Sequence, residues 1–282
     1  MNILVVGYGN AGQRHAEILS KKLGHCVEVV EAVTEKRSLA NMHGYRALLP
    51  PSSVCSENQY DGIVIAVAPF RHAEIAKEWA PCTSKLFIEK PGIGHGSQLI
   101  KYRELEYANP HQIAVGYQLR AVQRLISMQR QCRESGQMLI VHDLQNMHLW
   151  PSASYSRDIL LEYSHEIDLA NWFMGPFSAV RARWVSASSL NILCKTSERV
   201  AQITIDSNFD GYRRGCILHA SDSPMGYQWD FSREDNDAAY SAQLGAWLAG
   251  KPYCTIDHAN DTARLLSAIE RSLVSNEWTL MA

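Results

Sequence analysis

The stretch NILVVGYGNAGQRHAEIL, residues 2–19, decides the fold of this chain. Its apolar run ILVV is continuous rather than alternating, which is typical of a parallel strand covered on both faces. Three glycines with the spacing G-x-G-x-x-G follow at once, and the residues after them have a helical pattern. A strand, a glycine turn and a helix in this order predict a domain that binds a dinucleotide.

Each glycine has its own role in such a turn. Gly7 allows a tight turn, Gly9 lets the backbone approach a pyrophosphate, and Gly12 lets the helix pack close to the strand. The helix N-terminus adds N–H donors and the positive end of its dipole. A glycine turn without a ligand is the alternative, but the strand before it and the helix after it favour a pocket. The residues expected to contact the cofactor here are Gly7, Tyr8, Gly9, Asn10, Ala11 and Gly12.

The second predicted strand, CVEVVEAV at 26–33, bears on the choice of dinucleotide. Folds of this type place an acid about 20 residues past the last glycine, where it binds the adenosine ribose. That count falls on Thr34, which is followed by Glu35, Lys36 and Arg37. Without an acid at the strand end, Arg37 or Lys36 is able to pair with a 2′-phosphate, whereas Glu35 is able to serve the ribose. The sequence therefore leaves NAD and NADP both open.

Further apolar runs alternate with helical segments as far as residue 120: one at 63–68, one that ends in Glu89, and one at 112–120. This alternation predicts a doubly wound parallel sheet. Such sheets bind ligands beyond the carboxyl ends of their strands. The further cofactor candidates at these ends are Ala68, Pro69, His72, Glu89 and Lys90, and Tyr117 is a substrate candidate beside them.

The second half of the chain lacks this alternation. Its segments at 178–188, 200–209 and 215–222 are β-rich with mixed periodicity. The change comes near residue 118 without a linker. We therefore expect a Rossmann-type domain over 1–118 and an α+β domain over 119–282, with the last helix a candidate to pack back onto the first domain.

The composition is that of an ordinary globular protein. The 282 residues are 46% hydrophobic and 20% charged, and the net charge of -2 offers no field for nucleic acid or an anionic membrane. No apolar run approaches the roughly 20 residues that span a bilayer, and no leader pattern precedes residue 2, so we expect a cytoplasmic protein. The seven cysteines are scattered without a C-x-x-C pair, which favours reduced thiols and predicts no metal site.

Four motifs, taken in order, resemble the family of glucose-fructose oxidoreductase, inositol dehydrogenase and their relatives. They are GYGNAGQRH at 7–15, AVAPFRH at 66–72, EKP at 89–91 and LEYSHEID at 161–168. The resemblance covers nearly the whole chain. It implies an N-terminal Rossmann domain that binds NAD or NADP, and a C-terminal domain with an open, mostly antiparallel β-sheet. The face of that sheet covers the nicotinamide in the family and often forms an interface, so the resemblance also implies a homodimer or homotetramer.

Hydride transfer is the cofactor's own chemistry, so the protein must place the substrate and move one proton. Lys90 follows a buried strand and precedes Pro91, which makes it a rigid point from which an ammonium reaches a substrate hydroxyl. His165 titrates in the useful pH range. In the family that the sequence resembles, this histidine is commonly the proton-transfer partner of the lysine. The alternatives are a surface lysine at a strand end and a core histidine.

The carboxylate that orients His165 is open. Many members of the family place an Asp four residues before this histidine, where the present chain has Leu161. Glu162 lies three residues before it and Asp168 three after it, on what we predict to be a single helix that ends at Gly175. Because one position rotates a helical side chain by about a quarter turn or more, both Glu162 and Asp168 are candidates.

The resemblance also places polar and aromatic side chains around the substrate. Aromatic rings stack on sugar rings, and arginines reach hydroxyls, carboxylates or phosphates. The candidates are Arg120, Trp150, Tyr155 and Arg157, together with Tyr117. The implied activity is an NAD(P)-dependent oxidoreductase that interconverts a secondary alcohol and a ketone on a sugar, sugar acid or nucleotide sugar. A catalytically silent dinucleotide-binding regulator and a reductase of a non-sugar ligand are the alternatives.

Overall fold

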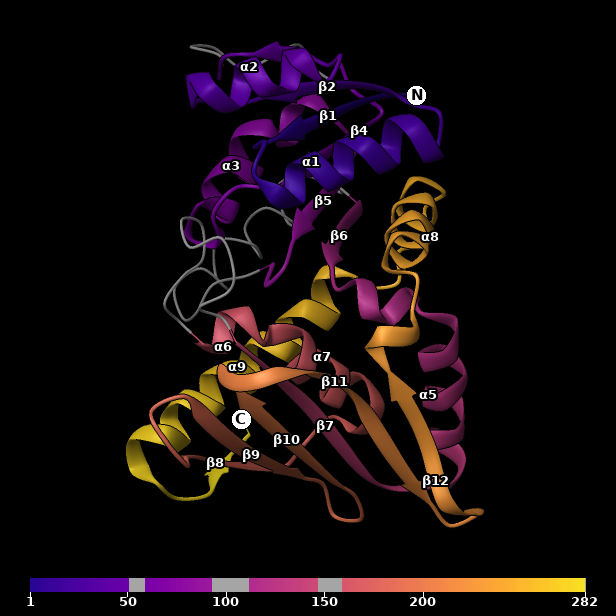
Figure 1. Cartoon of the computed structure of the whole chain (residues 1–282), viewed down its shortest axis with the longest axis vertical. Helices are drawn as coiled ribbons and strands as arrows, with labels where there is room; N and C mark the ends of the chain where they lie inside the picture. The colour runs from indigo at the N-terminus through magenta and orange to yellow at the C-terminus, as the bar shows by residue number, and fades with distance from the viewer. Residues whose placement is uncertain (51–58, 93–111, 147–158, 282) are drawn as a thin grey trace. The chain divides into compact units, whose positions relative to one another are not determined.

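The computed structural model describes residues 1–50, 59–92, 112–146 and 159–281 (Figure 1). Backbone contacts divide the chain into two compact units. Unit 1 comprises Met1–Ala121 and Asn236–Ala259, and unit 2 comprises Val122–Asp235 and Asn260–Ala282. Each unit is described by itself below.

Unit 1 contains a six-stranded sheet in which every neighbouring pair is parallel. The strand order is β3-β2-β1-β4-β5-β6, so the chain crosses over at β1 and β4. The strands are β1 (Asn2–Val6), β2 (Cys26–Val30), β3 (Arg46–Leu48), β4 (Gly62–Ile65), β5 (Lys85–Glu89) and β6 (Gln112–Gly116). The prediction of a doubly wound parallel sheet is confirmed.

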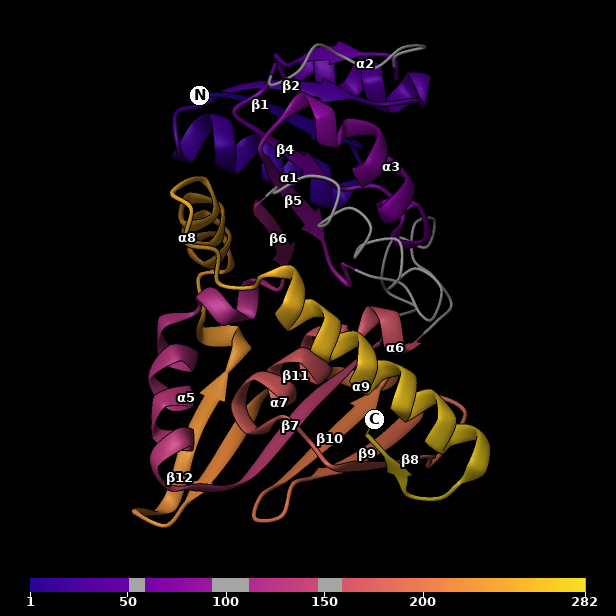
Figure 2. The ribbon, with the colours of Figure 1, turned by 180° about the vertical axis from the view of Figure 1, so that it is seen from behind.

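Helices cover both faces of this sheet, which explains why its strands are apolar without alternation. Ile3 and Val5 of β1 share a core cluster with residues of α1, η1, α2 and α8, whereas Leu4 and Val6 are buried on the opposite face, where α3 packs (Figure 2). The helices of unit 1 are α1 (Asn10–Glu17), the π-helix η1 (Ile18–Lys22), α2 (Thr34–Met42), η2 (Pro69–Arg71), α3 (His72–Trp79), η3 (Ala80–Cys82), η4 (Gln118–Ala121) and α8 (Asn236–Leu248).

The helix α8 comes from far along the chain and completes the core of unit 1. The Gln243 side chain donates a hydrogen bond of 3.0 Å to the carbonyl of Val115. The ring of Trp247 is fully buried, with its centroid 5.5 Å from that of Phe87. These contacts join α8 to β5 and β6. A helix from late in the sequence therefore packs against the parallel sheet of unit 1.

Unit 2 contains a seven-stranded sheet in the order β12-β11-β7-β10-β9-β8-β13. β7 and β10 are parallel, and all other neighbours are antiparallel. The strands are β7 (Gly136–Asn146), β8 (Ala179–Trp184), β9 (Ser189–Lys195), β10 (Val200–Asp206), β11 (Asn208–Ala220), β12 (Ser223–Asp230) and β13 (Thr279–Leu280). The predicted open, mostly antiparallel sheet is confirmed.

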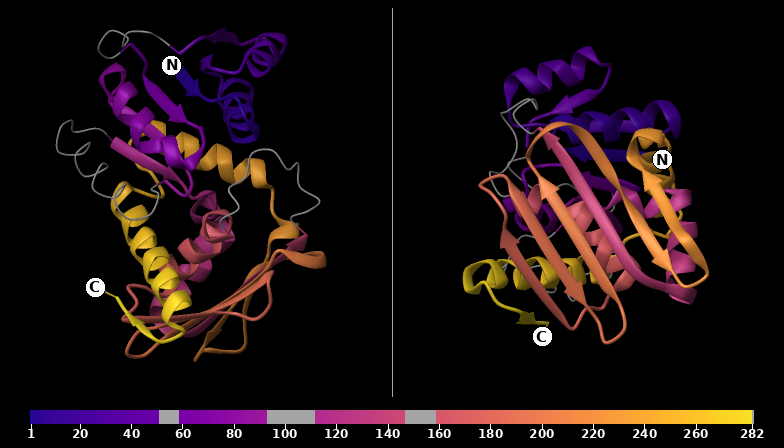
Figure 3. Two further views of the ribbon diagram at one scale, coloured as in Figure 1. Left: turned by 90° about the vertical axis from the view of Figure 1, so that its left-hand side faces the viewer. Right: turned by 60° about the horizontal axis from the view of Figure 1, so that its bottom comes forward.

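One face of this second sheet is covered by helices. Alternate residues of β10 are buried, namely Ala201, Ile203 and Ile205, and they lie beneath α7. Among the described residues, no helix covers the opposite face (Figure 3). The helices of unit 2 are α5 (Gln123–Ser135), α6 (Ile159–Glu162), α7 (Ser164–Met174) and η6 (Phe231–Arg233), and it also holds most of α9 (Ile256–Ser275).

The segment around His165 forms two helices, so the prediction of a single helix is wrong. α6 ends at Glu162, and Tyr163 has φ -93° and ψ 21° before α7 begins at Ser164. Tyr163 itself is buried. α7 then ends at Met174 ahead of Gly175, as predicted. Glu162 and His165 are therefore not on one continuous helix.

Membrane spans, metal ligands and cysteine pairing concern the described residues only. No helix there is long and apolar enough to cross a membrane. No group of three or more His, Cys, Asp or Glu side chains there is arranged to hold a metal ion. Cys82 is disulfide-bonded, so the expectation of reduced thiols is wrong for this residue. Within the described ranges, the free cysteines are Cys26, Cys132, Cys194, Cys216 and Cys254.

Candidate functional site

The glycine turn joins β1 to α1, and two of its positions exclude a side chain. Gly7 has φ +95°, and a Cβ there would lie 2.5 Å from the carbonyl oxygen of Ala66. A Cβ on Gly12 would lie 2.0 Å from the carbonyl oxygen of Gly7. At Gly9, by contrast, none of the described residues has an atom within 4 Å of the Cβ position. The turn is thus closely packed at Gly7 and Gly12 and open at Gly9, and the open position leaves room for a pyrophosphate to approach.

The N-terminus of α1 fits an anion equally well. Gly9 caps the helix without a side-chain hydrogen bond, and no acidic residue lies in the first turn. Asn10 is exposed and Ala11 half-buried at this end. The first N–H groups of a helix have no partner within it, and the dipole favours negative charge there. The residues present therefore fit the diphosphate of a dinucleotide.

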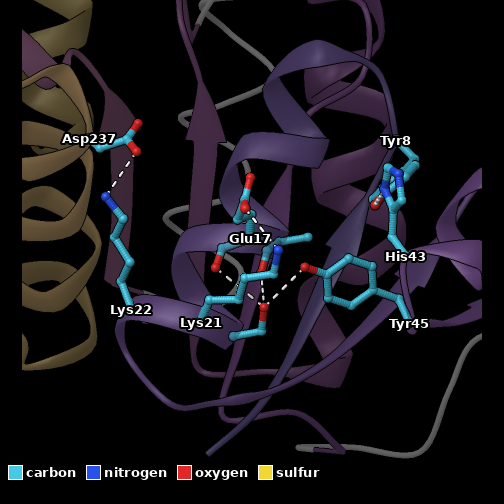
Figure 4. A network of polar contacts seen from close by, with 9 residues as sticks. Tyr8, Glu17, Lys21, Lys22, His43, Tyr45 and Asp237 are labelled. Carbon is cyan, nitrogen blue, oxygen red and sulfur yellow. Dashed lines mark hydrogen bonds and ion pairs between the residues drawn. The ribbon is translucent and has the colours of Figure 1, made fainter.

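Tyr8 contributes its backbone to this turn, and its side chain belongs to the core. The hydroxyl is 2.8 Å from Nδ1 of His43 (Figure 4). Burial, with smaller contributions from Tyr45 and Glu17, raises the pKa of Tyr8 to about 12. The Gln13 amide donates to the Tyr8 carbonyl at 3.2 Å and so braces the turn.

Glu31 is a candidate that reasoning from the sequence missed. It follows β2 directly and is buried. Its Oε2 accepts the backbone N–H of Tyr8 at 2.7 Å, and its Oε1 accepts that of Val33 at 2.8 Å. A carboxylate has about four acceptor positions, so two remain for ribose hydroxyls. The acid expected at the end of the second strand is therefore present, three residues before Thr34.

The count missed Glu31 because β2 ends at Val30, earlier than the apolar run suggested. Thr34 is instead the first residue of α2, and Glu35 is exposed in the first turn of that helix. The Arg37 guanidinium donates to the Glu31 carbonyl at 2.9 Å and to Thr34 Oγ1 at 3.2 Å. Arg37 thus stabilises the turn between β2 and α2.

The EKP motif forms the turn after β5. The Glu89 carboxylate accepts the backbone N–H of Lys90 at 3.0 Å and lies 2.6 Å from Nε2 of His15. Burial raises the pKa of the Glu89 carboxyl, but the hydrogen bond and charge of His15, together with Lys90, outweigh burial and hold the pKa below its usual value. Lys90 is half-buried at the carboxyl end of the strand. Glu89 is thus an internal carboxylate, whereas Lys90 lies just beyond the carboxyl end of β5.

The neighbouring turn after β4 holds three predicted cofactor residues. Ala68 and Pro69 are half-buried where η2 begins. His72 is buried, and its Nε2 lies 3.0 Å from the carbonyl oxygen of Val67. Burial lowers the pKa of His72, although the Val67 hydrogen bond opposes this. The His72 ring therefore holds this turn from inside.

Two predicted substrate residues of unit 1 are also internal. Tyr117 is fully buried, and its hydroxyl donates to the carbonyl of Pro91 at 3.2 Å. Arg120 is buried in η4. Through this hydrogen bond, Tyr117 stabilises the EKP turn. The other three substrate candidates, Trp150, Tyr155 and Arg157, lie outside the described residues.

The predicted catalytic residues of unit 2 lie around the start of α7. His165 and Asp168 are both buried on this helix. The Thr262 hydroxyl of α9 donates to Asp168 Oδ1 at 2.8 Å, so Asp168 joins α7 to α9. Glu162 is half-buried at the end of α6.

A buried ion cluster next to His165 was not predicted. The Arg214 guanidinium of β11 lies 2.7 Å from Oε1 of Glu166 on α7 and 3.2 Å from Oδ2 of Asp143 on β7. Its carbon is 4.7 Å from the centroid of the Phe231 ring. Burial lowers the pKa of Arg214, but the two carboxylates outweigh this and raise it above its usual value. The cluster fastens α7 to the sheet of unit 2.

Comparisons with known proteins complete this description. Residues 1–117 match the family described as "Oxidoreductase family, NAD-binding Rossmann fold" (GFO_IDH_MocA). A comparison with curated protein sequences finds no match. Solved structures, in contrast, share the fold over the whole chain.

Several of these structures are inositol dehydrogenases. Myo-inositol 2-dehydrogenase from Lactobacillus plantarum is 14% identical with a TM-score of 0.85, covering 100% of this chain and 99% of that one. Myo-inositol dehydrogenase from Corynebacterium glutamicum is 16% identical with a TM-score of 0.82, at the same coverage. Scyllo-inositol dehydrogenase from Lactobacillus casei, solved with NAD(H) and scyllo-inositol, is 12% identical with a TM-score of 0.82, covering 100% and 99%. Residues 1–117 therefore match the model of the oxidoreductase family that the motifs resemble, and the whole chain has the fold of solved inositol dehydrogenases.

Proposed function

We propose that this protein is an NAD-dependent dehydrogenase that interconverts a secondary alcohol and a ketone on a polyhydroxylated substrate. The substrate classes proposed are a cyclic polyol, a sugar, a sugar acid or a nucleotide sugar. The family match of residues 1–117 and the inositol dehydrogenases among the structures of the same fold support this class.

The position of Lys90 is the observation that carries the proposal. β1, β4 and β5 are adjacent parallel strands, so the glycine turn after β1 and Lys90 after β5 lie at the same edge of one sheet. That edge is where ligands bind in doubly wound sheets. Lys90 is half-buried there, and the Glu89 carboxylate accepts its backbone N–H at 3.0 Å and so fixes the turn that holds it.

The chain's part in the reaction is binding and proton transfer. NAD supplies the hydride acceptor when it is bound. Nζ of Lys90 takes the hydroxyl proton when the alcohol is oxidised and returns it in the reverse direction. His165 is the partner in this proton transfer, and Asp168 or Glu162 orients it. The Thr262 bond to Asp168 supports the view that this carboxylate also fixes α7.

Turnover of a polyol by the purified chain tests the proposal. We expect NADH to form from NAD with at least one member of a panel of myo-inositol, scyllo-inositol, sugars and sugar acids, followed by NADH absorbance. Lys90→Met should lower kcat by about 100-fold, since a positioned acid–base group contributes about this much or more. His165→Asn should also lower it.

The control for this assay is Lys77→Met, which removes an exposed lysine of α3 and should leave kcat unchanged. NADH binding without turnover on any substrate favours the silent regulator. Turnover only with a non-sugar ketone or imine favours the third alternative. Turnover that survives both Lys90→Met and His165→Asn overturns the assigned residues.

Glu31 leads to a further expectation about cofactor choice. A carboxylate at the end of β2 accepts ribose hydroxyls and repels a 2′-phosphate. We therefore propose that the protein prefers NADH to NADPH, by about 10-fold or more in Kd. Glu31→Gln should lower the ratio of the NADPH Kd to the NADH Kd by at least about fivefold, as measured by fluorescence titration with each cofactor.

Glu35→Gln is the matched control, because Glu35 carries the same charge in an exposed position of α2. It should leave the ratio unchanged. Tighter binding of NADPH by the wild type would instead return Arg37 and Lys36 to the role of phosphate ligands.

Other parts of the proposal stay predictions. They are the two functional domains at 1–118 and 119–282, the homodimer or homotetramer formed through the sheet of the second, the cytoplasmic location, and substrate contacts by Tyr117, Arg120, Trp150, Tyr155 and Arg157.

A further inference from the structure

We propose that His15 is a positioning residue for Lys90. Through its hydrogen bond to the Glu89 carboxylate, it fixes the turn after β5 and joins that turn to the helix that begins at the glycine motif. This inference rests on the proposed function for the role of Lys90, and the turn itself is testable without any substrate.

The first step is the bond between α1 and β5. His15 lies in the last turn of α1, and its ring is fully buried. Nε2 is 2.6 Å from Oε1 of Glu89, the last residue of β5. The two residues are 74 positions apart in the chain. A buried carboxylate without a partner is costly, so this bond is what allows a charged group to end the strand inside the protein.

The second step is the bond from Glu89 to the backbone of Lys90. The other carboxylate oxygen, Oε2, accepts the N–H of Lys90 at 3.0 Å. The N–H of Gly92 donates to the Glu89 carbonyl at 2.9 Å and closes the turn. Hydrogen bonds to an ionised acceptor are stronger than neutral ones. One carboxylate therefore connects α1 on one side with the Lys90 backbone on the other.

The surroundings hold this pair in one geometry. The His15 ring meets the edges or faces of Phe87 and Tyr240 at centroid distances of 5.3 and 5.5 Å. On the neighbouring strand, a Cβ on Gly116 would lie 3.0 Å from Oε1 of Glu89, so glycine there leaves room for the carboxylate. The side chains on α1, β5 and α8 thus determine the orientation of the pair.

The consequence is a physical link between the two ends of the candidate site. The N-terminus of α1 is the candidate diphosphate site, and the C-terminal turn of the same short helix holds the residue that precedes Lys90. Displacement of α1 would therefore move Lys90. The reaction rate falls when the residues that position a catalytic group become more mobile, even if the catalytic group itself is intact.

Amide hydrogen exchange tests the link without a substrate. His15→Leu removes the donor and keeps an apolar side chain, and His15→Gln restores an N–H near the position of Nε2. For each amide, the exchange rate in the variant is divided by the rate in the wild type, and the ratio at Val5 in the centre of the sheet serves as the reference for a general loss of stability. In His15→Leu we expect the ratios at Lys90 and Gly92 to be about 10-fold larger than the ratio at Val5. In His15→Gln the rates should return to within about threefold of the wild type.

Tyr45→Leu is the control for lost stability alone. Tyr45 is buried and directly precedes β3, which lies at the opposite edge of the sheet from β6. Its loss should lower the melting temperature without a selective change at Lys90 and Gly92. In His15→Leu, kcat with myo-inositol or the best polyol should fall about 10-fold, with the Kd of NADH within about threefold of the wild type.

Equal acceleration at Lys90, Gly92 and Val5 in His15→Leu would show a merely structural role and overturn the proposal. An unchanged kcat in the folded variant would do the same. If the wild type turns over no polyol, the proposed function fails, whereas the exchange ratios still decide whether His15 fixes the turn.

Discussion

Gly12→Ala is expected to weaken NADH binding by about 1,000-fold or more and to lower the melting temperature of the protein. The new Cβ would lie 2.0 Å from the carbonyl oxygen of Gly7 and 2.9 Å from its carbonyl carbon. Both atoms belong to the backbone, which has no rotamer to change. Either α1 moves away from β1 or the glycine turn opens, and in both cases the first N–H groups of α1 leave the diphosphate.

Two other glycines are matched controls for the same substitution. Gly9 has an open Cβ position among the described residues and φ -74°, so Gly9→Ala should fold normally but place a methyl group where the diphosphate approaches. Gly245 in α8 also has an open Cβ position, and Gly245→Ala should bind NADH normally with a stability gain of up to about 1 kcal/mol. NADH fluorescence titration and thermal unfolding of the three variants separate these effects. Normal binding by Gly12→Ala would contradict the role given to the turn.

Local patterns in the sequence predicted unit 1 well. A buried parallel strand needs apolar residues on both faces, and β1 shows this directly in Ile3, Leu4, Val5 and Val6. The glycine spacing then identified the turn. A Cβ on Gly12 would collide with the carbonyl of Gly7 within the turn itself, whereas a Cβ on Gly7 would collide with the backbone of Ala66, just after β4.

Positions that depend on where an element ends were predicted less well. The apolar run continued past Val30, but Glu31 turns its carboxylate back to the N–H of Tyr8 and ends the strand there. Similarly, the residues around Tyr163 have a helical pattern, yet the backbone departs from the helix at Tyr163 and forms α6 and α7 instead of one helix.

Pairs that are distant in sequence were not predictable from one chain. Nothing in the motif GYGNAGQRH indicates that His15 meets Glu89, because their contact depends on the crossing of α1 over β5. The same is true of Arg214, whose partners Glu166 and Asp143 come from a helix and a neighbouring strand. Glu89 was a candidate because it ends a predicted strand, and His15 ends a quoted motif but was not singled out, whereas Arg214 lies outside every motif.

Arg214→Met is expected to lower the free energy of unfolding of unit 2 by about 3–5 kcal/mol, which is the usual cost of leaving buried charges without their partner. In the native protein, one guanidinium faces the carboxylates of Glu166 and Asp143, whose side chains are each only 2% exposed. Its removal leaves two buried negative charges side by side, and protonation of one of them is the least costly response. Urea unfolding followed by circular dichroism measures the loss, which should become smaller as the pH is lowered because the abandoned carboxylates then bind protons.

Arg213→Met is the matched control, because Arg213 is the preceding residue of β11 and is exposed. In the pairing of β11 with β7, Arg213 lies opposite Leu144, whereas Arg214 lies opposite Asp143. Successive residues of a strand point to opposite faces, so the control removes the same charge from the same strand without touching the cluster. It should change the free energy of unfolding by less than about 0.5 kcal/mol. Equal effects of the two substitutions, or a loss in Arg214→Met that does not depend on pH, would show that Glu166 and Asp143 do not require Arg214. Because Glu166 follows His165 directly on α7, a large loss in Arg214→Met alone would mean that the helix with the candidate proton-transfer histidine is held to its sheet by charge.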